Sequence, residues 1–378
     1  MKLSELETPA LILDRPRLTA NIAAMSARMK DHGVDLRPHL KTAKSADVAR
    51  LATAAHSGAI TVSTLAEAAY FARSGFRDIT YAVGITPAKL PRVAALCRDG
   101  VRLAVITDSA AIAREIGRTA DCGDGIGVFI KIDSGQGRAG IRPDDDALLD
   151  IAQALEDGPS ASLRGVLTHA GHSYGCATVA EIETVAEAER RAVVGAAERL
   201  RSAGIDCPEV SVGSSPTVRF GRSFEGVTEV RPGVYMFNDA FQAGLGCCAL
   251  DDVALTVLAT VTGHRRDLDM LLIDAGGLAL SKDRSTEHQA EDVGYGLVYD
   301  ETGEQRLGSL LVSAVHQEHG LVTPGNHGDP VAFDALPIGA RIRVIPNHAC
   351  MTAAAYDCYH VVDGGDEIIA EWPRVNGW

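Results

Sequence analysis

Two of the chain's few lysines stand close together, at Lys41 and Lys44 in the segment RPHLKTAK. Only seven lysines occur in 378 residues, so the pair calls for a chemical explanation. A lysine amine that is partly desolvated or near other cations loses its proton readily and can form a Schiff base with an aldehyde. Two surface lysines that open a helix are an equally acceptable interpretation, and spacing alone does not choose between Lys41 and Lys44.

Two glycine-containing segments could help to bind a phosphorylated cofactor. In VGSSPT, the backbone N–H groups and hydroxyls of Gly213, Ser214 and Ser215 could surround a phosphate. In DSGQGR, Arg138 could direct its guanidinium at a ring atom. Each signal is weak by itself, because such turns and loop arginines more often have no ligand.

Histidine and cysteine stand two residues apart in NHAC, directly after the strand-like run RIRVIP. If the strand ends there, His348 and Cys350 can each direct one ligand at a metal ion. Imidazole with thiolate favours a borderline-soft ion, zinc first, with manganese or cobalt as substitutes. Two protein ligands would leave positions open for water and substrate, which suits catalysis. Packing in the core is the alternative role.

Short β-branched runs alternate with Ala-rich segments of helical periodicity from about residue 35 to residue 236, which predicts a parallel sheet. The eight predicted strands are VDLRPHL (34–40), AITVST (59–64), ITYAV (79–83), RLAVIT (102–107), IGVFIKID (126–133), LRGVLTHA (163–170), EVSVGS (209–214) and EVRPGVYM (229–236). Clear helix candidates cover residues 45–57, 64–75 and 178–204. Eight repeats favour an α/β fold with a closed (β/α)8 TIM barrel, in which chemistry gathers at the C-terminal ends of the strands.

The pattern changes after about residue 246 to strand-like runs with turn residues, which predicts a β-domain. Examples are residues 253–264, 270–276, 295–300, 341–348 and 359–364. The opening run ALILD (10–14) has no place among the eight barrel strands and could pair with that domain. We therefore expect a barrel of residues 15–245 and a β-domain of residues 1–14 together with 246–378.

Composition and charge exclude several functions. The formal net charge is −14, and nucleic-acid binding depends on clustered Lys and Arg, so we expect no nucleic-acid partner. The first residues lack the signal-peptide pattern, and no apolar run of about 18 residues could span a bilayer. We expect a cytoplasmic protein without a membrane partner. Its eight cysteines are scattered, so we expect mostly thiols.

In their order along the chain, these segments resemble the D-serine dehydratase, D-threo-3-hydroxyaspartate dehydratase and D-threonine aldolase family. This family consists of pyridoxal-phosphate enzymes of the alanine-racemase fold. The segments are TPALILD, RPHLKTAKS, TVSTLAEA, DSGQGRAGI, THAGHSY, VSVGSSPT, EVRPGVYMFND, QEHG and PNHAC. They span nearly the whole chain, and such an ordered series is far more specific than any one member.

The resemblance implies a role for several of these residues. Lys41 would form the Schiff base with pyridoxal 5′-phosphate, and Lys44 would belong to a helix. The turn 213–215 would bind the cofactor phosphate, with Arg138 and Tyr174 near the cofactor ring. The metal ligands beside the substrate would be His348 and Cys350. Less certain neighbours are His169, His172, Tyr235 and Asp239.

Within this family, aldolases typically carry aspartate at the position of Cys350, so a histidine with a cysteine favours dehydration of a D-β-hydroxy-amino acid. Lys41 would remove the Cα proton, the cofactor would take up the developing negative charge, and the metal would assist loss of the β-hydroxyl. The products would be a 2-oxo acid and ammonia. The alternatives are a metal-dependent D-threonine aldolase, which gives glycine and an aldehyde, and a non-catalytic pyridoxal-phosphate-binding protein.

The residues do not choose among D-serine, D-threonine and D-threo-3-hydroxyaspartate as the substrate. Side chains that could select the β-substituent are Gln242, Tyr174, His172 and Arg219. The resemblance also implies a homodimer, because in this fold the C-terminal domain of one subunit commonly approaches the barrel mouth of another.

Overall fold

The computed structural model of this chain describes residues 1–325 and 330–378, which form two compact units. The barrel unit consists of residues 24–233 with 375–378, and the β-unit consists of residues 1–23 with 234–374. The sequence-based division placed the boundaries after residues 14 and 245. Packing places them within helix α1 (Arg15–Asp31) and directly before the 3-10 turn η4 (Val234–Met236).

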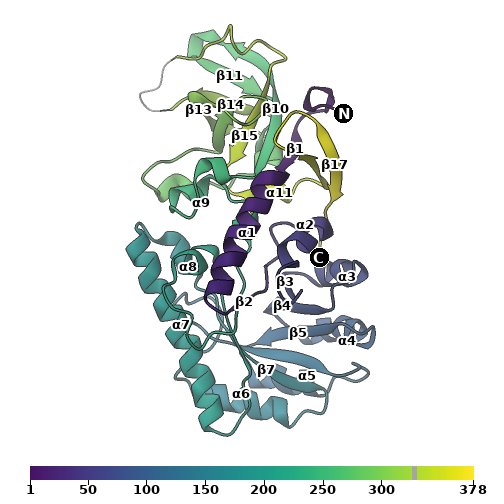
Figure 1. Cartoon of the computed structure of the whole chain (residues 1–378). Coiled ribbons are helices and arrows are strands. Elements are labelled where there is room, and N and C mark those ends of the chain that lie inside the picture. Colours follow the sequence, from purple (N-terminus) through teal and green to yellow (C-terminus); the bar gives the residue numbers. More distant parts are fainter. Residues whose placement is uncertain (326–329) are drawn as a thin grey trace. The chain divides into compact units, whose positions relative to one another are not determined.

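Eight parallel strands of the described chain form the sheet of the barrel unit, in the order β2-β9-β8-β7-β6-β5-β4-β3 (Figure 1). They are β2 (Asp35–Leu36), β3 (Ile60–Val62), β4 (Asp78–Gly84), β5 (Arg102–Thr107), β6 (Ile126–Lys131), β7 (Ala161–Leu167), β8 (Glu209–Val212) and β9 (Glu229–Val230). A parallel bridge between His39 and Thr61 closes the sheet. Each predicted run overlaps one of these strands, so the predicted barrel fold is confirmed.

Helices alternate with these strands. They are α2 (Ala46–Thr53), α3 (Leu65–Arg73), α4 (Leu90–Arg98), α5 (Ala110–Gly117), α6 (Ala147–Glu156), α7 (Val179–Ser202) and α8 (Ser215–Phe220). Capping explains two of the starting points: Thr64 accepts a hydrogen bond from Glu67 N at the start of α3, and Thr178 forms a capping box with Glu181 at the start of α7. No helix in the described ranges is both long enough and apolar enough to cross a membrane.

Strands β2 and β9 are much shorter than the predicted runs 34–40 and 229–236. Pro38 and Pro232 stop the regular ladders, because proline has no backbone N–H to donate. The two segments nevertheless continue side by side, since Arg37 N donates to Val230 O and His39 N donates to Pro232 O, both at 2.9 Å. The backbone that leads to Lys41 is therefore held against the segment that follows β9.

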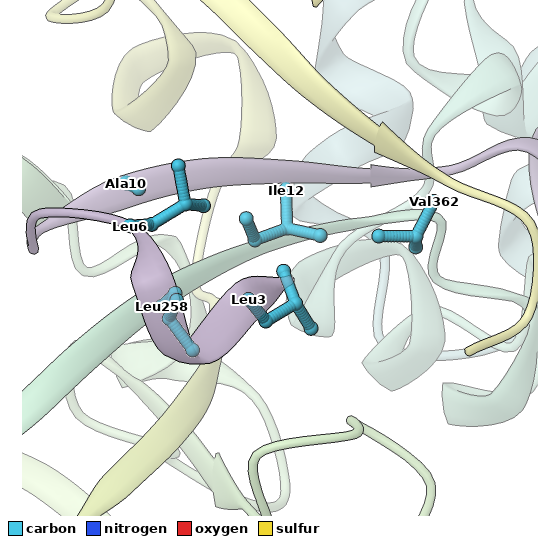
Figure 2. Packing of buried hydrophobic residues seen from close by; sticks show 6 residues of the cluster. All are labelled: Leu3, Leu6, Ala10, Ile12, Leu258 and Val362. Atoms are coloured by element: carbon cyan, nitrogen blue, oxygen red, sulfur yellow. The ribbon is translucent and has the colours of Figure 1, made fainter. Parts of the chain in front are cut away.

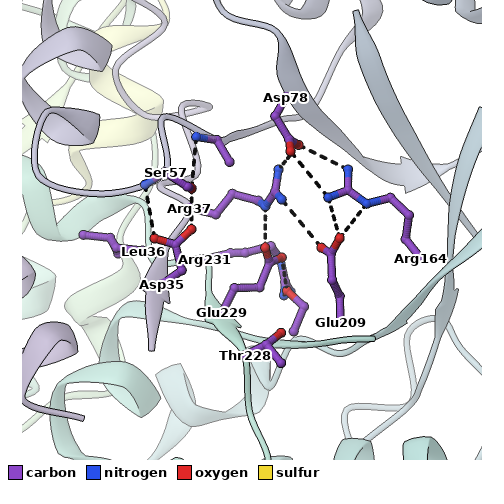
Figure 3. A network of polar contacts seen from close by, with 12 residues as sticks. Asp35, Leu36, Arg37, Ser57, Asp78, Arg164, Glu209, Thr228, Glu229 and Arg231 are labelled. Carbon is purple, nitrogen blue, oxygen red and sulfur yellow. Dashed lines mark hydrogen bonds and ion pairs between the residues drawn. The ribbon is translucent and has the colours of Figure 1, made fainter. Parts of the chain in front are cut away.

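Five charged side chains, from β4, β7, β8, β9 and the residue directly after β2, form a largely buried network (Figure 3). Arg37, which is 3% exposed, contacts Glu229 and Asp78, each at 2.6 Å. Arg164 contacts Glu209 at 2.6 Å and Asp78 at 3.2 Å. Burial opposes the charge of Asp78, but Arg37 and Arg164 outweigh it and lower the pKa of that carboxyl to about 2. The network therefore stabilises the barrel through paired charges as well as apolar packing.

The β-unit contains a nine-stranded sheet within the described residues, in the order β11-β14-β13-β12-β15-β10-β1-β16-β17 (Figure 1). Its strands are β1 (Ala10–Asp14), β10 (Leu255–Arg265), β11 (Met270–Ile273), β12 (Gly296–Tyr299), β13 (Arg306–Val315), β14 (Gly320–Pro324), β15 (Arg341–Pro346), β16 (Cys358–Val362) and β17 (Ile368–Pro373). The opening strand β1 pairs antiparallel with β10 and parallel with β16, which confirms its expected pairing.

Apolar side chains from distant parts of the sequence pack together around β1 (Figure 2). The cluster consists of Leu3, Leu6, Ala10, Ile12, Leu258 and Val362. Ile12 and Leu258 are fully buried, and burial of such a side chain contributes roughly 1.5–3 kcal/mol. The N-terminal segment is therefore an integral part of the β-unit core.

Candidate active site

Lys41 lies in the turn that follows β2, and its side chain is exposed. Lys44 does not belong to a helix, contrary to the expectation, because it has a φ of +49° and precedes Ser45, the N-cap of α2. Lys44 Nζ lies 3.4 Å from Oε1 of the buried Glu67. The two lysines are thus distinguished by the structure: Lys44 is committed to an ion pair, whereas Lys41 is accessible.

Two neutral imidazoles accompany Lys41. The backbone N–H of Lys41 donates to His39 Nδ1 at 3.4 Å. The Nδ1–H of His169 donates to the carbonyl oxygen of Gly213, since a carbonyl can only accept. Burial and the charge of Lys41 lower the pKa of His169 to about 3 and hold the pKa of His39 well below its usual value. Neither ring therefore adds a positive charge beside Lys41 at neutral pH.

Close backbone packing explains the glycine in the turn after β8. A Cβ at Gly213 would lie 2.8 Å from the backbone nitrogen of Arg231, so a larger residue would require a shift of the backbone. The N–H of Gly213 donates to Glu189 Oε1 at 3.3 Å. Gly213 therefore shapes this turn while its own N–H is already engaged.

Both serines of the same turn are buried, each 2% exposed. Ser214 caps α8 by accepting from Thr217 N at 3.2 Å, and its Oγ lies 2.9 Å from Ser173 Oγ. Ser215 is the first residue of α8. Because the Ser214 hydroxyl is committed to protein contacts, a phosphate at this turn would depend mainly on backbone groups.

Arg138 is exposed in a loop that Asp133 organises. The Asp133 carboxylate accepts from Gly135 N at 3.0 Å and from Gly137 N at 3.2 Å. Tyr174 is half-buried in the 3-10 turn η3 (Gly171–Gly175), which follows β7. The predicted barrel residues therefore all lie in segments that follow the C-terminal ends of strands.

Sequence reasoning missed several buried charged residues of the barrel unit, among them Lys131 and Glu189. Lys131 is the last residue of β6, and burial together with the charges of Arg231 and Arg138 lowers its pKa to about 7. A signal for Lys131 was present, since it interrupts the apolar strand IGVFIKID near its C-terminal end. Glu189 lies on α7 among other charged residues, which concealed it in the sequence.

A cleft with a volume of about 430 Å³ lies at the other end of the barrel strands. Its lining includes Arg50, Arg77, Asp78 and Arg102. Asp78 and Arg102 are the first residues of β4 and β5. In barrels, the N-terminal ends of the strands carry stability and not chemistry, so we leave this cleft outside the candidate site.

Tyr235 and Asp239 belong to the β-unit. Tyr235 is buried in η4 and not at the end of a barrel strand, because the ladder of β9 stops before Pro232. Burial raises the pKa of Tyr235. Asp239 accepts from Gln242 N at 2.8 Å and from Ala349 N at 2.9 Å, so it joins the helix α9 (Ala240–Gly244) to the helix α11 (Ala349–Ala353).

His348 and Cys350 stand at the start of α11, directly after β15. His348 Nδ1 lies 2.7 Å from Asp283 Oδ2, and the His348 ring also hydrogen-bonds with Cys350. Burial disfavours the imidazolium, but Asp283 and Cys350 outweigh it and raise the pKa of His348 to about 11. With Nδ1 engaged, Nε2 of His348 and the Cys350 sulfur, each after loss of its proton, form a ligand pair of the kind that zinc accepts.

No group of three His, Cys, Asp or Glu side chains suited to a metal ion is found in residues 1–325 and 330–378. The pair His348 and Cys350 would therefore leave further coordination positions to water or substrate. No disulfide joins the cysteines in the same ranges, and Cys247 and Cys248 do not bridge each other, so the expectation of thiols is confirmed.

Two family models match most of the chain. Residues 13–240 match the alanine racemase N-terminal domain, and residues 254–362 match a serine dehydratase domain. A parallel barrel with a lysine after its first strand, followed by an antiparallel β-unit, places the protein in the class of pyridoxal-phosphate enzymes with the alanine-racemase fold.

Relatives of nearly equal length narrow this class. The D-threo-3-hydroxyaspartate dehydratase of Delftia sp. (strain HT23) is 44% identical, over 99% of this chain and 98% of the relative, and its solved structure covers both chains fully with a TM-score of 0.96. A cysteine-to-alanine variant of a D-threo-3-hydroxyaspartate dehydratase, solved in a metal-free form, has the same TM-score, coverage and 43% identity. The D-serine dehydratase of Dictyostelium discoideum is 32% identical, over 100% of this chain and 98% of the relative. The chain belongs to the D-serine dehydratase and D-threo-3-hydroxyaspartate dehydratase family, as its sequence motifs predicted.

Proposed function

We propose that this carbon–nitrogen lyase dehydrates a D-β-hydroxy-amino acid, with D-threo-3-hydroxyaspartate as the first candidate and D-serine as the second. The observation that carries the proposal is the 44% identity to a D-threo-3-hydroxyaspartate dehydratase along almost the whole of both chains. The overall reaction would release ammonia and a 2-oxo acid. We further propose that the enzyme works in the cytoplasm and uses zinc, with manganese or cobalt as substitutes.

Lys41 is the proposed attachment point of pyridoxal phosphate. When bound, the cofactor supplies an electron sink that stabilises negative charge at the substrate Cα. The exposed amine of Lys41 is the residue able to hold the cofactor aldehyde and then to accept the Cα proton. The low pKa values of His39 and His169 make both rings weak proton acceptors, which leaves that proton transfer to Lys41.

The turn 213–215 is the proposed phosphate site, and Arg138, Tyr174, His169 and Tyr235 are proposed neighbours of the cofactor. The Ser214 hydroxyl is already hydrogen-bonded to Ser173, and the Gly213 backbone packs closely against the backbone of Arg231. Both contacts support a preformed turn that needs little reorganisation when the phosphate binds. A larger residue at Gly213 would meet the Arg231 backbone and distort this turn.

His348 and Cys350 are the proposed metal ligands. Their side chains are held together by a hydrogen bond, and Asp283 orients the imidazole from behind. A metal at this pair would draw electron density from the substrate β-hydroxyl and make it a better leaving group. The metal-free cysteine-to-alanine variant of a relative supports a metal role for a cysteine in this family.

The relatives from Delftia sp. and Dictyostelium discoideum are both dehydratases. They therefore favour neither the D-threonine aldolase alternative nor the non-catalytic pyridoxal-phosphate-binding protein. Cys350, where aldolases typically carry aspartate, points the same way.

The test is to incubate the protein and pyridoxal phosphate with D-threo-3-hydroxyaspartate or D-serine, and to measure 2-oxo acid and ammonia. The activity should fall at least tenfold with a chelator and return with zinc, and the faster substrate identifies the natural class. The variant His348→Ala should behave like the chelated enzyme. If neither compound yields a 2-oxo acid with metal restored, while D-threonine yields an aldehyde, the dehydratase proposal is wrong.

A further inference from the structure

Glu189 is a buried carboxylate on the apolar face of the long helix α7. The buried positions of α7 are Ile182, Ala186, Glu189, Val193, Ala196, Ala197 and Leu200. Their spacing of three or four residues is that of a single helix face, and Glu189 occupies its middle. Glu189 is 2% exposed, and a carboxylate at such a place must be compensated by donors.

Three donors from separate segments compensate it. Glu189 Oε1 accepts from Ala170 N at 2.8 Å and from Gly213 N at 3.3 Å, and Oε2 accepts from Thr217 Oγ1 at 2.8 Å. Ala170 lies in the loop after β7, Gly213 lies in the turn after β8, and Thr217 lies in α8. One carboxylate therefore joins the two loops that the proposed function assigns to the cofactor.

Two ties between neutral side chains and neutral partners also join these loops. The Nδ1–H of His169 in the β7 loop donates to the carbonyl oxygen of Gly213 in the β8 turn. Ser173 Oγ of the β7 loop lies 2.9 Å from Ser214 Oγ of the β8 turn. A contact between two neutral groups contributes about half as much as a hydrogen bond to a charged group. Because Glu189 accepts two backbone N–H groups and a hydroxyl while it is itself held by a helix, it is the stronger connection.

We propose that Glu189 is a positioning residue that holds the β7 loop and the β8 turn together in the shape that receives the cofactor phosphate. The inference rests on the proposed function for the identity of the ligand, and on the three contacts of Glu189 for the clamp itself. Glu189 makes no contact with the ligand, because its oxygens face Ala170, Gly213 and Thr217. These donors stabilise the carboxylate, and the positive charges of the buried Arg231 and Lys131 oppose its negative charge close to the phosphate site.

The experiment compares Glu189→Ala with Glu189→Gln in two measurements. The first is hydrogen exchange of the Ala170 and Gly213 amides in protein freed of cofactor, and the second is the Kd for pyridoxal phosphate. Loss of the carboxylate in Glu189→Ala should speed exchange in both loops and weaken cofactor binding, each by roughly 10- to 100-fold. Glu189→Gln should fall between Glu189→Ala and the wild type in both measurements, because its neutral amide oxygen still accepts from the two N–H groups but more weakly than a carboxylate.

Two further variants keep the test interpretable. Glu187→Ala removes a half-buried carboxylate of the same helix, which pairs with Arg190 and Arg191 instead of the two loops, and should change neither measurement. Thr217→Val removes one donor from Glu189 and should shift both measurements in the same direction but less, even if Glu189→Ala fails to fold.

The outcomes separate the clamp from the proposed function. Unchanged exchange in Glu189→Ala would overturn the clamp, whatever the enzyme binds. Faster exchange with an unchanged Kd would overturn its role in shaping the phosphate site. If the wild type fails to bind pyridoxal phosphate, the proposed function is wrong and the cofactor part of this inference is wrong with it, whereas the exchange result still decides the clamp.

Discussion

At the scale of single residues, the choice between Lys41 and Lys44 leads to a paired prediction. Lys41→Ala should abolish covalent attachment of pyridoxal phosphate with little effect on stability, because the side chain is exposed. Lys44→Ala should keep the attachment but lose about 3 kcal/mol of stability, because it leaves the buried Glu67 charge unpaired. The measurements are the protein mass after borohydride reduction and the urea unfolding curve. An adduct that persists in Lys41→Ala and is absent from Lys44→Ala would assign the cofactor to Lys44.

Residue type and position along the sequence identified only part of the candidate site. Lysine, histidine and cysteine at strand ends drew attention to Lys41, His348 and Cys350. Glu67, the partner of Lys44, and Asp283, the partner of His348, gave no such signal, because acidic residues are common in helices and loops and become notable only when buried or paired. The candidate site was therefore predicted at the residues that carry chemistry and missed at the residues that position them.

At the scale of elements, the buried network of Figure 3 predicts an acid-dependent loss of stability. The folded pKa of Asp78 is about 2, below the ordinary 3.8, so the unfolded chain binds more protons between these values. The contribution of Asp78, about 2 kcal/mol, is complete above pH 4 and is lost as the pH falls through 2. Asp78→Asn should therefore destabilise the protein at pH 7, and its difference from the wild type should shrink toward pH 2.

Urea unfolding at several pH values measures this difference. Asp144→Asn provides the control, because Asp144 pairs with Arg142 on the surface and should change stability little at any pH. A stability difference for Asp78→Asn that stays constant from pH 7 to pH 2 would show that the Asp78 carboxylate does not act through its charge.

The elements themselves were predicted to different extents. The eight barrel strands followed from alternating β-branched and Ala-rich segments, whereas β2 and β9 proved shorter because Pro38 and Pro232 interrupt their ladders. In the β-unit, β13 lay outside the runs named from the sequence, and so did the shorter strands β14 and β17. Short strands of five or six residues, such as these, depend on neighbouring strands for stability and leave little periodicity to detect.

At the scale of the whole molecule, the family resemblance leads us to propose a homodimer. Sedimentation equilibrium should give about twice the 39.8 kDa of one chain, and Lys41→Ala should give the same mass, because an exposed lysine that binds cofactor has no part in folding. A monomer with full activity would contradict this proposal.

The sequence by itself determined the class of fold and the order of the barrel strands and helices, and it offered the lysine pair and the histidine–cysteine pair as candidates for the site. These properties depend on local periodicity and on residues that stand close together along the chain. Only the tertiary structure decided three pairings. Lys44 forms an ion pair with Glu67, Asp283 forms a hydrogen bond with His348 across 65 positions, and Glu189 joins two loops. Such partners are chosen by burial, since an unpaired charge in the interior costs far more than the same charge on the surface, and burial depends on how distant segments pack.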